Sequence, residues 1–117
     1  MTQEDKDLLF KDICGRLPYG VIVQSTFYYC DGTIWKYENE TLTSKLLNYT
    51  ISRYKPYLLP MSNMTEEQYK TYCELEHSGN MEHLSLPLLE WLNKSHFDYR
   101  GLIEKGLAID ATNLNIY

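Results

Sequence analysis

The sequence predicts an α+β fold: a small antiparallel sheet of three to five strands, preceded by an N-terminal helix and followed by two to three C-terminal helices. Three observations favour this prediction. Apolar residues recur at helical spacing near both ends of the chain, β-branched and aromatic residues concentrate between 21 and 37, and Asp31-Gly32 is the strongest hairpin signal present. The 117 residues contain no repeat, low-complexity tract or linker, so we expect one domain over residues 1–117.

An amphipathic helix is expected over residues 3–16. Thr2 and Asp5 have the spacing of a capping box at its start, and Pro18 stops it at its end. Its buried face is expected to hold the apolar residues at positions i, i+3, i+4 and i+7, which are Phe10, Ile13, Cys14 and Leu17.

Residues 19–37 have the composition of strands, and an antiparallel meander is expected there. Successive side chains of a strand point to opposite faces of the sheet. On the strand that returns after the hairpin, Ile34 and Lys36 should therefore face one side. Trp35 and Tyr37 should face the other side.

The middle of the chain is harder to interpret. Residues 38–48 mix helical spacing with extended composition, and we interpret them as a strand or loop that leads into a further strand over 49–54. Residues 55–60 must be extended, because each proline in this stretch pushes the preceding residue out of the helical region.

The C-terminal part predicts helices. Thr65 and Gln68 have capping-box spacing, so a helix is expected over 66–77. Three further elements should follow: an apolar core helix from Leu84 that ends near 93–95, a short helical turn over 99–105, and a short strand or extended segment over 107–109.

Composition limits the classes of function. The chain is 44% hydrophobic and 14% aromatic with a net charge of −5, so it is globular, and its acidity argues against nucleic acid as a partner. No apolar run is long enough to cross a membrane, and the N-terminus is acidic where a secretory signal is basic, so we expect a cytoplasmic protein with no membrane partner. The three widely spaced cysteines, Cys14, Cys30 and Cys73, are interpreted as reduced and mostly buried thiols.

Tyrosine is the most unusual component. The chain has 11 tyrosines, several of them in the expected sheet, and tyrosine is enriched at interfaces because it combines a large ring with a polar hydroxyl. The other interpretation is that these rings only pack across neighbouring strands. The leading hypothesis is a non-enzymatic module that binds a protein partner or forms a homo-oligomer through an aromatic sheet face; its candidate binding residues are Tyr28, Trp35, Tyr37 and Tyr57.

The second candidate site is the run around His96, Asp98 and Arg100. A histidine near a carboxylate can act as a general base, so the alternative hypothesis is a small hydrolase-like or metal-dependent enzyme centred on His96 and Asp98. The same residues also fit a polar link in which Asp98 caps the following turn. We count all three as candidate binding residues and assign no catalytic role.

Other motifs are too sparse to assign. Cys73, His77 and His83 have workable metal-ligand spacing but lack a fourth partner, and Cys30 beside the hairpin turn lacks an evident base. No metal site and no cofactor are therefore expected. A third hypothesis, a phage-type regulator that mimics nucleic acid, would require acidic side chains gathered on one face.

Several phrases of the chain resemble a group of short, uncharacterised proteins of gut Bacteroidetes bacteria and their prophages. The clearest are Trp91-Leu92-Asn93, the run from His96 to Ile103, and Gly106-Leu107-Ala108. The resemblance implies a small intracellular protein of phage or mobile-element origin, and it brings no activity. The chain departs from the group at Leu59, where the group has arginine, and in its C-terminal tail.

Overall fold

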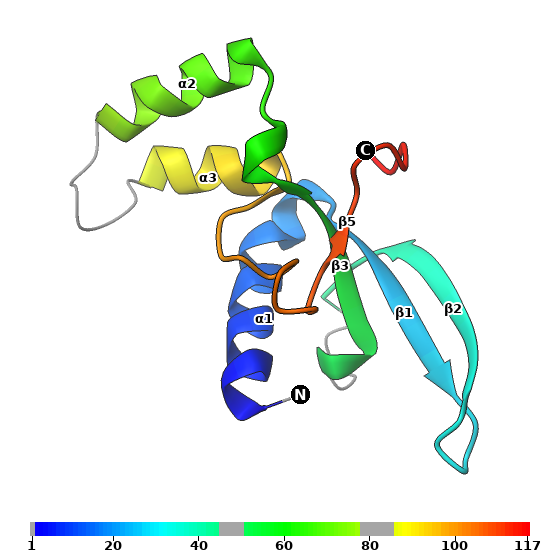
Figure 1. The fold of residues 1–117 in the computed structure, drawn as a ribbon. Helices are drawn as coiled ribbons and strands as arrows, with labels where there is room; N and C mark the ends of the chain where they lie inside the picture. Colours follow the sequence, from blue (N-terminus) through cyan, green and yellow to red (C-terminus); the bar gives the residue numbers. More distant parts are fainter. Residues whose placement is uncertain (1, 45–50, 78–85) are drawn as a thin grey trace.

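The computed structural model describes residues 2–44, 51–77 and 86–117 (Figure 1). Its elements in chain order are α1 (Gln3–Arg16), the 3₁₀ turn η1 (Leu17–Tyr19), β1 (Ile22–Tyr28), β2 (Ile34–Thr41), η3 (Ile51–Arg53), β3 (Tyr54–Pro60), η4 (Met61–Asn63), α2 (Glu66–His77), α3 (Leu86–Lys94), β4 (Phe97–Asp98) and β5 (Ile109–Asp110). The mixed fold is confirmed: an N-terminal helix, a five-stranded sheet and further helices.

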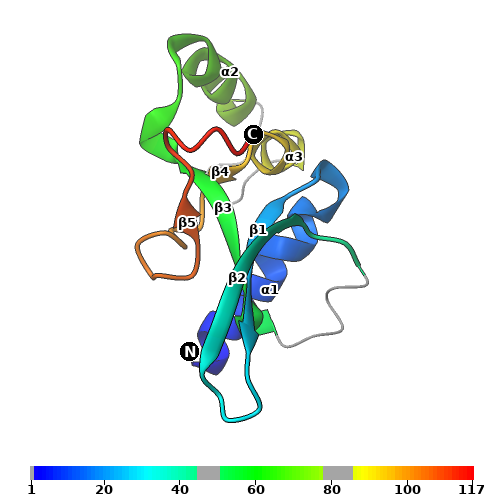
Figure 2. The same cartoon turned by 90° about the vertical axis from the view of Figure 1, so that its right-hand side faces the viewer.

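The sheet has the strand order β2-β1-β3-β4, and β5 also pairs with β3 (Figure 2). β1 runs antiparallel to both β2 and β3, whereas β4 and β5 run parallel to β3. The expected antiparallel arrangement therefore holds for the three long strands only. The two parallel strands have two residues each, which is too short for any alternation to be visible in the sequence.

Helix α1 begins where it was expected. The Thr2 hydroxyl accepts a hydrogen bond from the backbone N–H of Asp5 at 3.1 Å, which caps the helix. The buried face is rotated from the expected one, because Leu9 and Ile13 are buried while Phe10 and Cys14 are exposed.

The core has two parts. The larger part lies between α1 and the sheet, where Leu9 and Ile13 pack with Val23, Tyr54 and Leu58. Val23, Tyr54 and Leu58 share one face of the sheet, since Val23 lies opposite Pro56, Ser25 lies opposite Tyr54, and side chains alternate along a strand. The smaller part is formed by α3 and β4, with contributions from α2; its buried residues are Leu88, Leu92 and Phe97.

Strands β1 and β2 with their connecting loop, residues 22–41, form an extension that we call the hairpin arm (Figures 1 and 2). Its loop closes where Tyr29 N donates to Thr33 O at 2.8 Å, and Gly32 supplies the left-handed residue with φ 89°. The molecule is elongated, with a radius of gyration of 15.2 Å, where a compact chain of this length has about 13 Å. Within the arm, β2 is the strand on the side away from β3.

A bulge changes the alternation expected on β2. Phe27 lies opposite Lys36 and Tyr28 lies opposite Ile34, so Trp35 is an additional residue on that strand. The expectation that Trp35 and Lys36 face opposite sides is wrong for this reason. Their side chains instead lie together, with Lys36 Nζ 4.6 Å from the centre of the Trp35 ring.

Several other sequence predictions can be compared with the structure. The helix over 66–77 and the extended stretch over 55–60 are confirmed as α2 and part of β3. Residues 51–53 form a 3₁₀ turn and not a strand, and residues 99–105 form turns and not a helix. Residues 49 and 50, also expected in a strand, lie outside the described residues.

Candidate functional site

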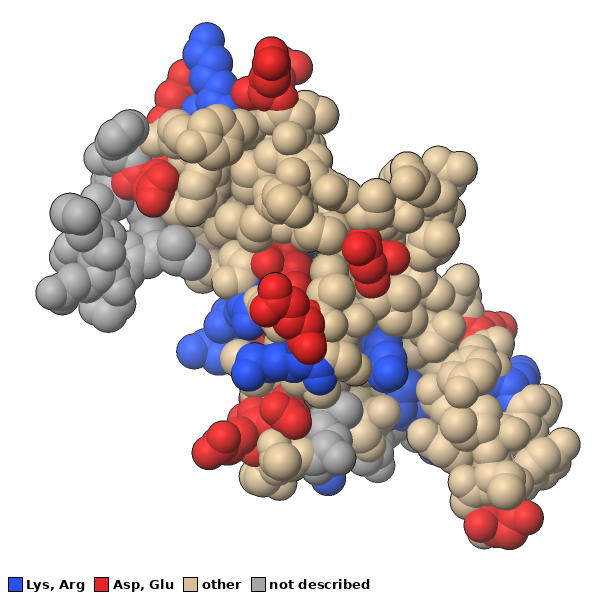
Figure 3. Space-filling model, viewed as in Figure 1, with Lys and Arg blue, Asp and Glu red and all other residues tan. Residues whose placement is uncertain are grey.

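Large aromatic side chains are exposed on the outer half of the hairpin arm. Tyr28, Trp35 and Tyr37, all expected to bind, are 46%, 48% and 58% exposed, and Tyr29 is 60% exposed. In Figure 3 the lower-right part of the surface, which corresponds to the arm, is mostly uncharged, with acidic atoms at its tip and both acidic and basic atoms along its right side. The arm therefore presents the kind of apolar surface that binding sites for proteins use.

The Trp35 ring is held in place by its neighbours. Its centre lies 6.0 Å from that of Phe27 and 6.1 Å from that of Tyr29, in tilted arrangements typical of aromatic pairs. The ammonium group of Lys36 covers both Trp35 and Phe27, at 4.6 Å from each ring. A ring that is already ordered loses less conformational entropy when a partner binds.

Tyr37 lies on the other side of the arm from these rings. It is opposite Thr26 in β1, and Tyr28 follows Thr26 at the next position on the same face. Phe27, at the position between them, points toward the Trp35 side. The arm thus exposes aromatic rings on both faces.

The outer edge of β2 also exposes backbone hydrogen-bonding groups. Leu42 N donates to Val21 O at 2.9 Å, which makes this a hydrogen-bonded pair of the ladder. Hydrogen-bonded pairs alternate in an antiparallel ladder, so the backbone groups of Lys36, Glu38 and Glu40 also point to β1. The groups of Tyr37 and Asn39 then point outward, where β2 is the edge strand of the described sheet.

Charged residues lie on either side of Tyr37 in β2, with Lys36 before it and Glu38 after it. Lys36 and Glu38 form an ion pair along β2 at 3.4 Å, with both side chains about half exposed. An exposed pair of this kind contributes little to the stability of the monomer, at most about 1 kcal/mol. Both charges remain accessible to a partner.

Tyr57 does not belong to this surface. It is only 5% exposed, and its hydroxyl donates to Asn39 Oδ1 at 2.6 Å. Its expected place among the exposed binding residues is therefore corrected: Tyr57 connects β3 to β2 from inside the molecule.

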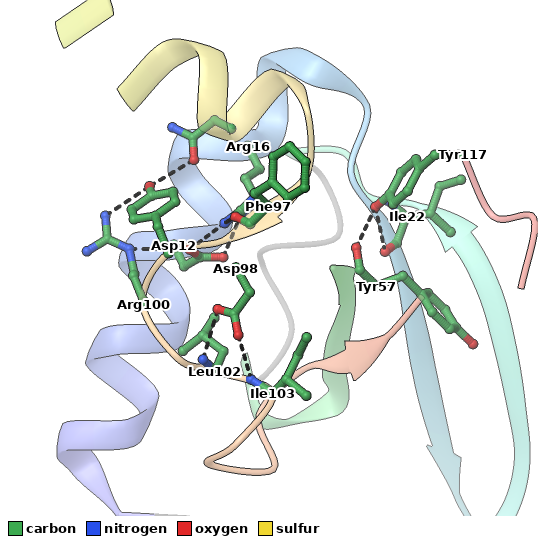
Figure 4. A network of polar contacts seen from close by, with 12 residues as sticks. Asp12, Arg16, Ile22, Tyr57, Phe97, Asp98, Arg100, Leu102, Ile103 and Tyr117 are labelled. Carbon is green, nitrogen blue, oxygen red and sulfur yellow. Dashed lines mark hydrogen bonds and ion pairs between the residues drawn. The ribbon is translucent and has the colours of Figure 1, made fainter. Parts of the chain in front are cut away.

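The residues of the second candidate, His96, Asp98 and Arg100, have separate partners. Asp98 Oδ1 accepts from Leu102 N at 2.9 Å and Asp98 Oδ2 accepts from Ile103 N at 3.0 Å (Figure 4). This confirms the interpretation of Asp98 as the cap of the following turn. No hydrogen bond joins the side chains of His96 and Asp98, which are both among the described residues, so the orienting pair that the enzyme hypothesis requires is not formed in this structure.

His96 is held as a neutral ring. Burial, together with a smaller effect of the nearby Arg16 guanidinium, lowers the pKa of His96 from 6.5 to about 4. Its Nδ1 atom is buried without a hydrogen-bond partner among the described residues, and its backbone has the left-handed φ of 64°. Its ring stacks on that of Tyr117, at a centroid distance of 3.6 Å.

Arg100 belongs to a buried ionic network (Figure 4). Its Nε lies 3.3 Å from Asp12 Oδ1, and the other oxygen of Asp12 accepts from Arg16 Nε at 2.8 Å. Arg16 Nη2 donates to the backbone oxygen of Phe97 at 2.6 Å, so the network connects α1 to β4. Both guanidinium groups lie over the Tyr99 ring, whose hydroxyl donates to the side chain of Asn93.

Sequence reasoning missed Asp12 and Arg16, which are both 0% exposed. Their spacing of four residues was visible, and it is the spacing at which a helix brings opposite charges together. A salt bridge with this spacing is common on exposed helix faces, so the spacing alone gives no sign of burial. Their contacts with Phe97 and Arg100 join α1 to β4 and to the turn that follows it, which gives the network a structural role. Arg16 Nη1 and His96 Nδ1 are both buried without a hydrogen-bond partner among the described residues.

The other sequence candidates give no additional site. No group of three or more metal-binding side chains occurs among the described residues, and the side chain of His77 and all of His83 lie outside them. Cys14 and Cys30 are exposed, so the expectation of mostly buried thiols is wrong for these two. An open pocket of about 400 Å³ lies beside Asp98 and is lined by Met61, Ser62 and Glu104 among others, but the Asp98 oxygens are already occupied.

Comparisons with known proteins identify no relative: no family model, curated protein or solved structure matches the chain. The resemblance to short Bacteroidetes and prophage proteins stays a prediction. Within the described part of the chain, no helix combines the length and the apolar character that crossing a bilayer requires.

Proposed function

We propose that this protein is a non-enzymatic protein-association module and that its contact surface is the hairpin arm. In this proposal β2 adds to the edge of a sheet in a partner protein, through its outward backbone groups and the exposed rings beside them. This mode of recognition is known as β-strand addition; the backbone gives affinity and the side chains give specificity.

The observation that carries the proposal is the exposed edge of β2. The strand has eight residues, seven of them exposed, and lies at the end of the described strand order. Natural proteins usually protect such an edge by shortening it, by covering it, or by placing proline, charged side chains or a bulge on it, because an exposed edge pairs with other chains. β2 is neither short nor interrupted by proline; its charges are of both signs, so a partner of matching charge order can pair with it. The bulge at Trp35 disturbs only the start of β2, and residues 36–41 keep a regular register with β1.

The rings beside this edge supply the second part of the argument. Edge pairing alone provides hydrogen bonds that water also provides, so affinity requires apolar area as well. Tyr28, Trp35 and Tyr37 supply such area on the arm, away from the α1 core. Aromatic residues are the ones that most often dominate the energy of protein interfaces.

A photo-crosslinking residue placed at position 37 tests the proposal in cells that produce the protein. Tyr69 on α2 is the matched control site, because its 60% exposure nearly equals the 58% of Tyr37. A discrete adduct from position 37, absent from position 69, is expected.

An edge-blocking variant shows whether the adduct depends on strand addition. Asn39→Pro removes an outward N–H and no ladder hydrogen bond to β1, so it should abolish the adduct while the arm stays folded. Asn39→Ala is its control, because it equally removes the acceptor of the Tyr57 hydroxyl but keeps the N–H, and it should leave the adduct in place. The same adducts from positions 37 and 69, or an adduct that survives Asn39→Pro, would contradict the proposed function.

A further inference from the structure

We infer that the partner of β2 is a second copy of this chain, and that the two β2 strands pair antiparallel with Tyr37 opposite Tyr37 of the second copy. This inference rests on the proposed function, because it names the partner that the same edge binds. The structure supports it through the direction of the backbone groups and the order of charges along β2.

The backbone allows β2 to pair with itself. In a dimer with two-fold symmetry the same strand edge occurs on both copies. When the symmetry axis passes through a residue, odd-numbered residues of one copy face odd-numbered residues of the other, and even-numbered residues face even-numbered ones. Residues with outward backbone groups, such as Tyr37 and Asn39, therefore face one another across the new ladder. Registers centred on residues 36, 37, 38 and 39 all meet this requirement.

The charges select one of these registers. A centre at Lys36 places two lysines directly opposite. A centre at Glu38 pairs Lys36 with Glu40 twice but places two glutamates directly opposite at its middle. A centre at Asn39 pairs Glu38 with Glu40 twice. Among these four registers, only the centre at Tyr37 forms two lysine–glutamate pairs, Lys36 of each copy with Glu38 of the other, without placing like charges opposite each other.

The geometry of the selected register favours these contacts. Lys36 and Glu38 have their backbone groups directed to β1, so they form non-hydrogen-bonded pairs across the new interface. In such pairs the Cα atoms are about 4.5 Å apart and the side chains are at their closest. The exposed ring of Tyr37 then lies at the centre of the new interface.

Single charge reversals should weaken the dimer, and mixing them should restore it. Lys36→Glu places two carboxylates opposite each other in both cross-strand pairs, and Glu38→Lys places two ammonium groups opposite each other in both. We expect each variant alone to dimerise roughly tenfold more weakly than the unchanged protein. In an equimolar mixture each cross-strand pair again joins a carboxylate to an ammonium group, so the affinity should return to within about threefold of the original.

Sedimentation velocity over a range of concentrations measures these affinities. Lys70→Glu and Glu74→Lys are the matched controls, since they make the same charge changes at exposed positions of α2. Neither control, alone or mixed, should change the dimerisation constant. Circular dichroism of each variant alone shows whether it has the secondary structure of the unchanged protein. Only variants that pass this check are compared alone and in mixture.

The outcomes separate the inference from the proposed function. A dimer that the mixture does not restore overturns the register. A protein that stays monomeric at every concentration overturns self-pairing. A crosslink from position 37 to a different protein also overturns self-pairing, but it supports the arm as a binding surface. Absence of both a dimer and an arm-specific crosslink overturns the two together.

Discussion

The phenol ring of Tyr117 lies flat against the imidazole of His96, with ring centres 3.6 Å apart and planes within 5° of each other. The Tyr117 hydroxyl accepts from Ile22 N at 2.9 Å and donates to Tyr57 O at 2.8 Å. Ile22 and Tyr57 would be the next hydrogen-bonded pair of the β1–β3 ladder, which ends at Val23 and Pro56. The last residue of the chain thus replaces a ladder hydrogen bond where the two strands separate.

Replacing Tyr117 by phenylalanine tests this connection. Tyr117→Phe keeps the ring that stacks on His96 and removes the hydroxyl, so Ile22 N and Tyr57 O lose a partner. The free energy of unfolding should fall by about 1–2 kcal/mol in urea titration. Tyr29→Phe, at an exposed tyrosine, should change it by less than about 0.5 kcal/mol. Equal effects of the two substitutions would contradict the proposed role of the hydroxyl.

His96 should make the stability of the fold depend on pH. Its pKa is about 4 in the folded protein and near 6.5 when exposed, mainly because burial disfavours the charged ring. Between these values the unfolded chain binds more protons, so the stabilisation present above pH 6.5 is lost as the pH falls toward 4. We expect about 1–2 kcal/mol of loss from this residue, since part of the ring reaches solvent.

His96→Phe separates this effect from other acid effects. The variant keeps a ring against Tyr117 but has no group that titrates, so its unfolding free energy should change less between pH 6.5 and 4 than that of the unchanged protein. Urea titrations at several pH values measure the difference in slope. Parallel pH profiles for the two proteins would exclude His96 as the source.

The buried network makes the order of three substitutions predictable. Asp12→Ala leaves the fully buried Arg16 without its carboxylate and should destabilise the fold by about 3–5 kcal/mol. Arg100→Ala should cost less than about 1.5 kcal/mol, because its side chain is 19% exposed and Asp12 keeps Arg16. Asp12→Leu with Arg16→Met should cost less than the sum of the single changes. Additive single and double effects in thermal unfolding would contradict this coupling.

Asp98 should stabilise the fold because its two oxygens accept hydrogen bonds from two backbone N–H groups, and not through its charge alone. Asp98→Ala removes the acceptors of Leu102 N and Ile103 N and should destabilise the fold by about 2–3 kcal/mol. Asp98→Asn keeps one carbonyl oxygen, so its effect should lie between that of Asp98→Ala and that of no change. Denaturant titration of the two variants checks the order; equal losses would argue against the two-oxygen cap.

Local sequence signals predicted the elements that local interactions specify. The Thr2 cap, the reciprocal Thr65–Gln68 capping box and the Asp31-Gly32 turn are each formed by residues close together in the chain. The bulge at Trp35 and the parallel pairing of β4 and β5 depend on which strands meet, and no short pattern records that choice. The same is true of Tyr117, whose partner Ile22 is 95 residues away.

The candidate site could be predicted in part for the same reason. Tyrosine density between 28 and 57 indicated an aromatic sheet, and Tyr28 and Tyr37 are exposed on it. Tyr57 has the same residue type in the same sheet, but it is 5% exposed, its hydroxyl is bonded to Asn39, and its backbone pairs with Ile109 of β5. Which rings remain exposed depends on segments that return from the other end of the chain.

Hydrogen exchange of individual backbone amides, measured by NMR at increasing protein concentration, tests most directly whether the outer edge of β2 is an association surface. The amides of Tyr37 and Asn39 should exchange quickly in dilute protein and slow by at least about tenfold as dimers form. The amides of Glu38 and Glu40, already bonded to β1, should be protected throughout. Concentration-dependent dimerisation during which Tyr37 and Asn39 keep exchanging quickly would contradict the account.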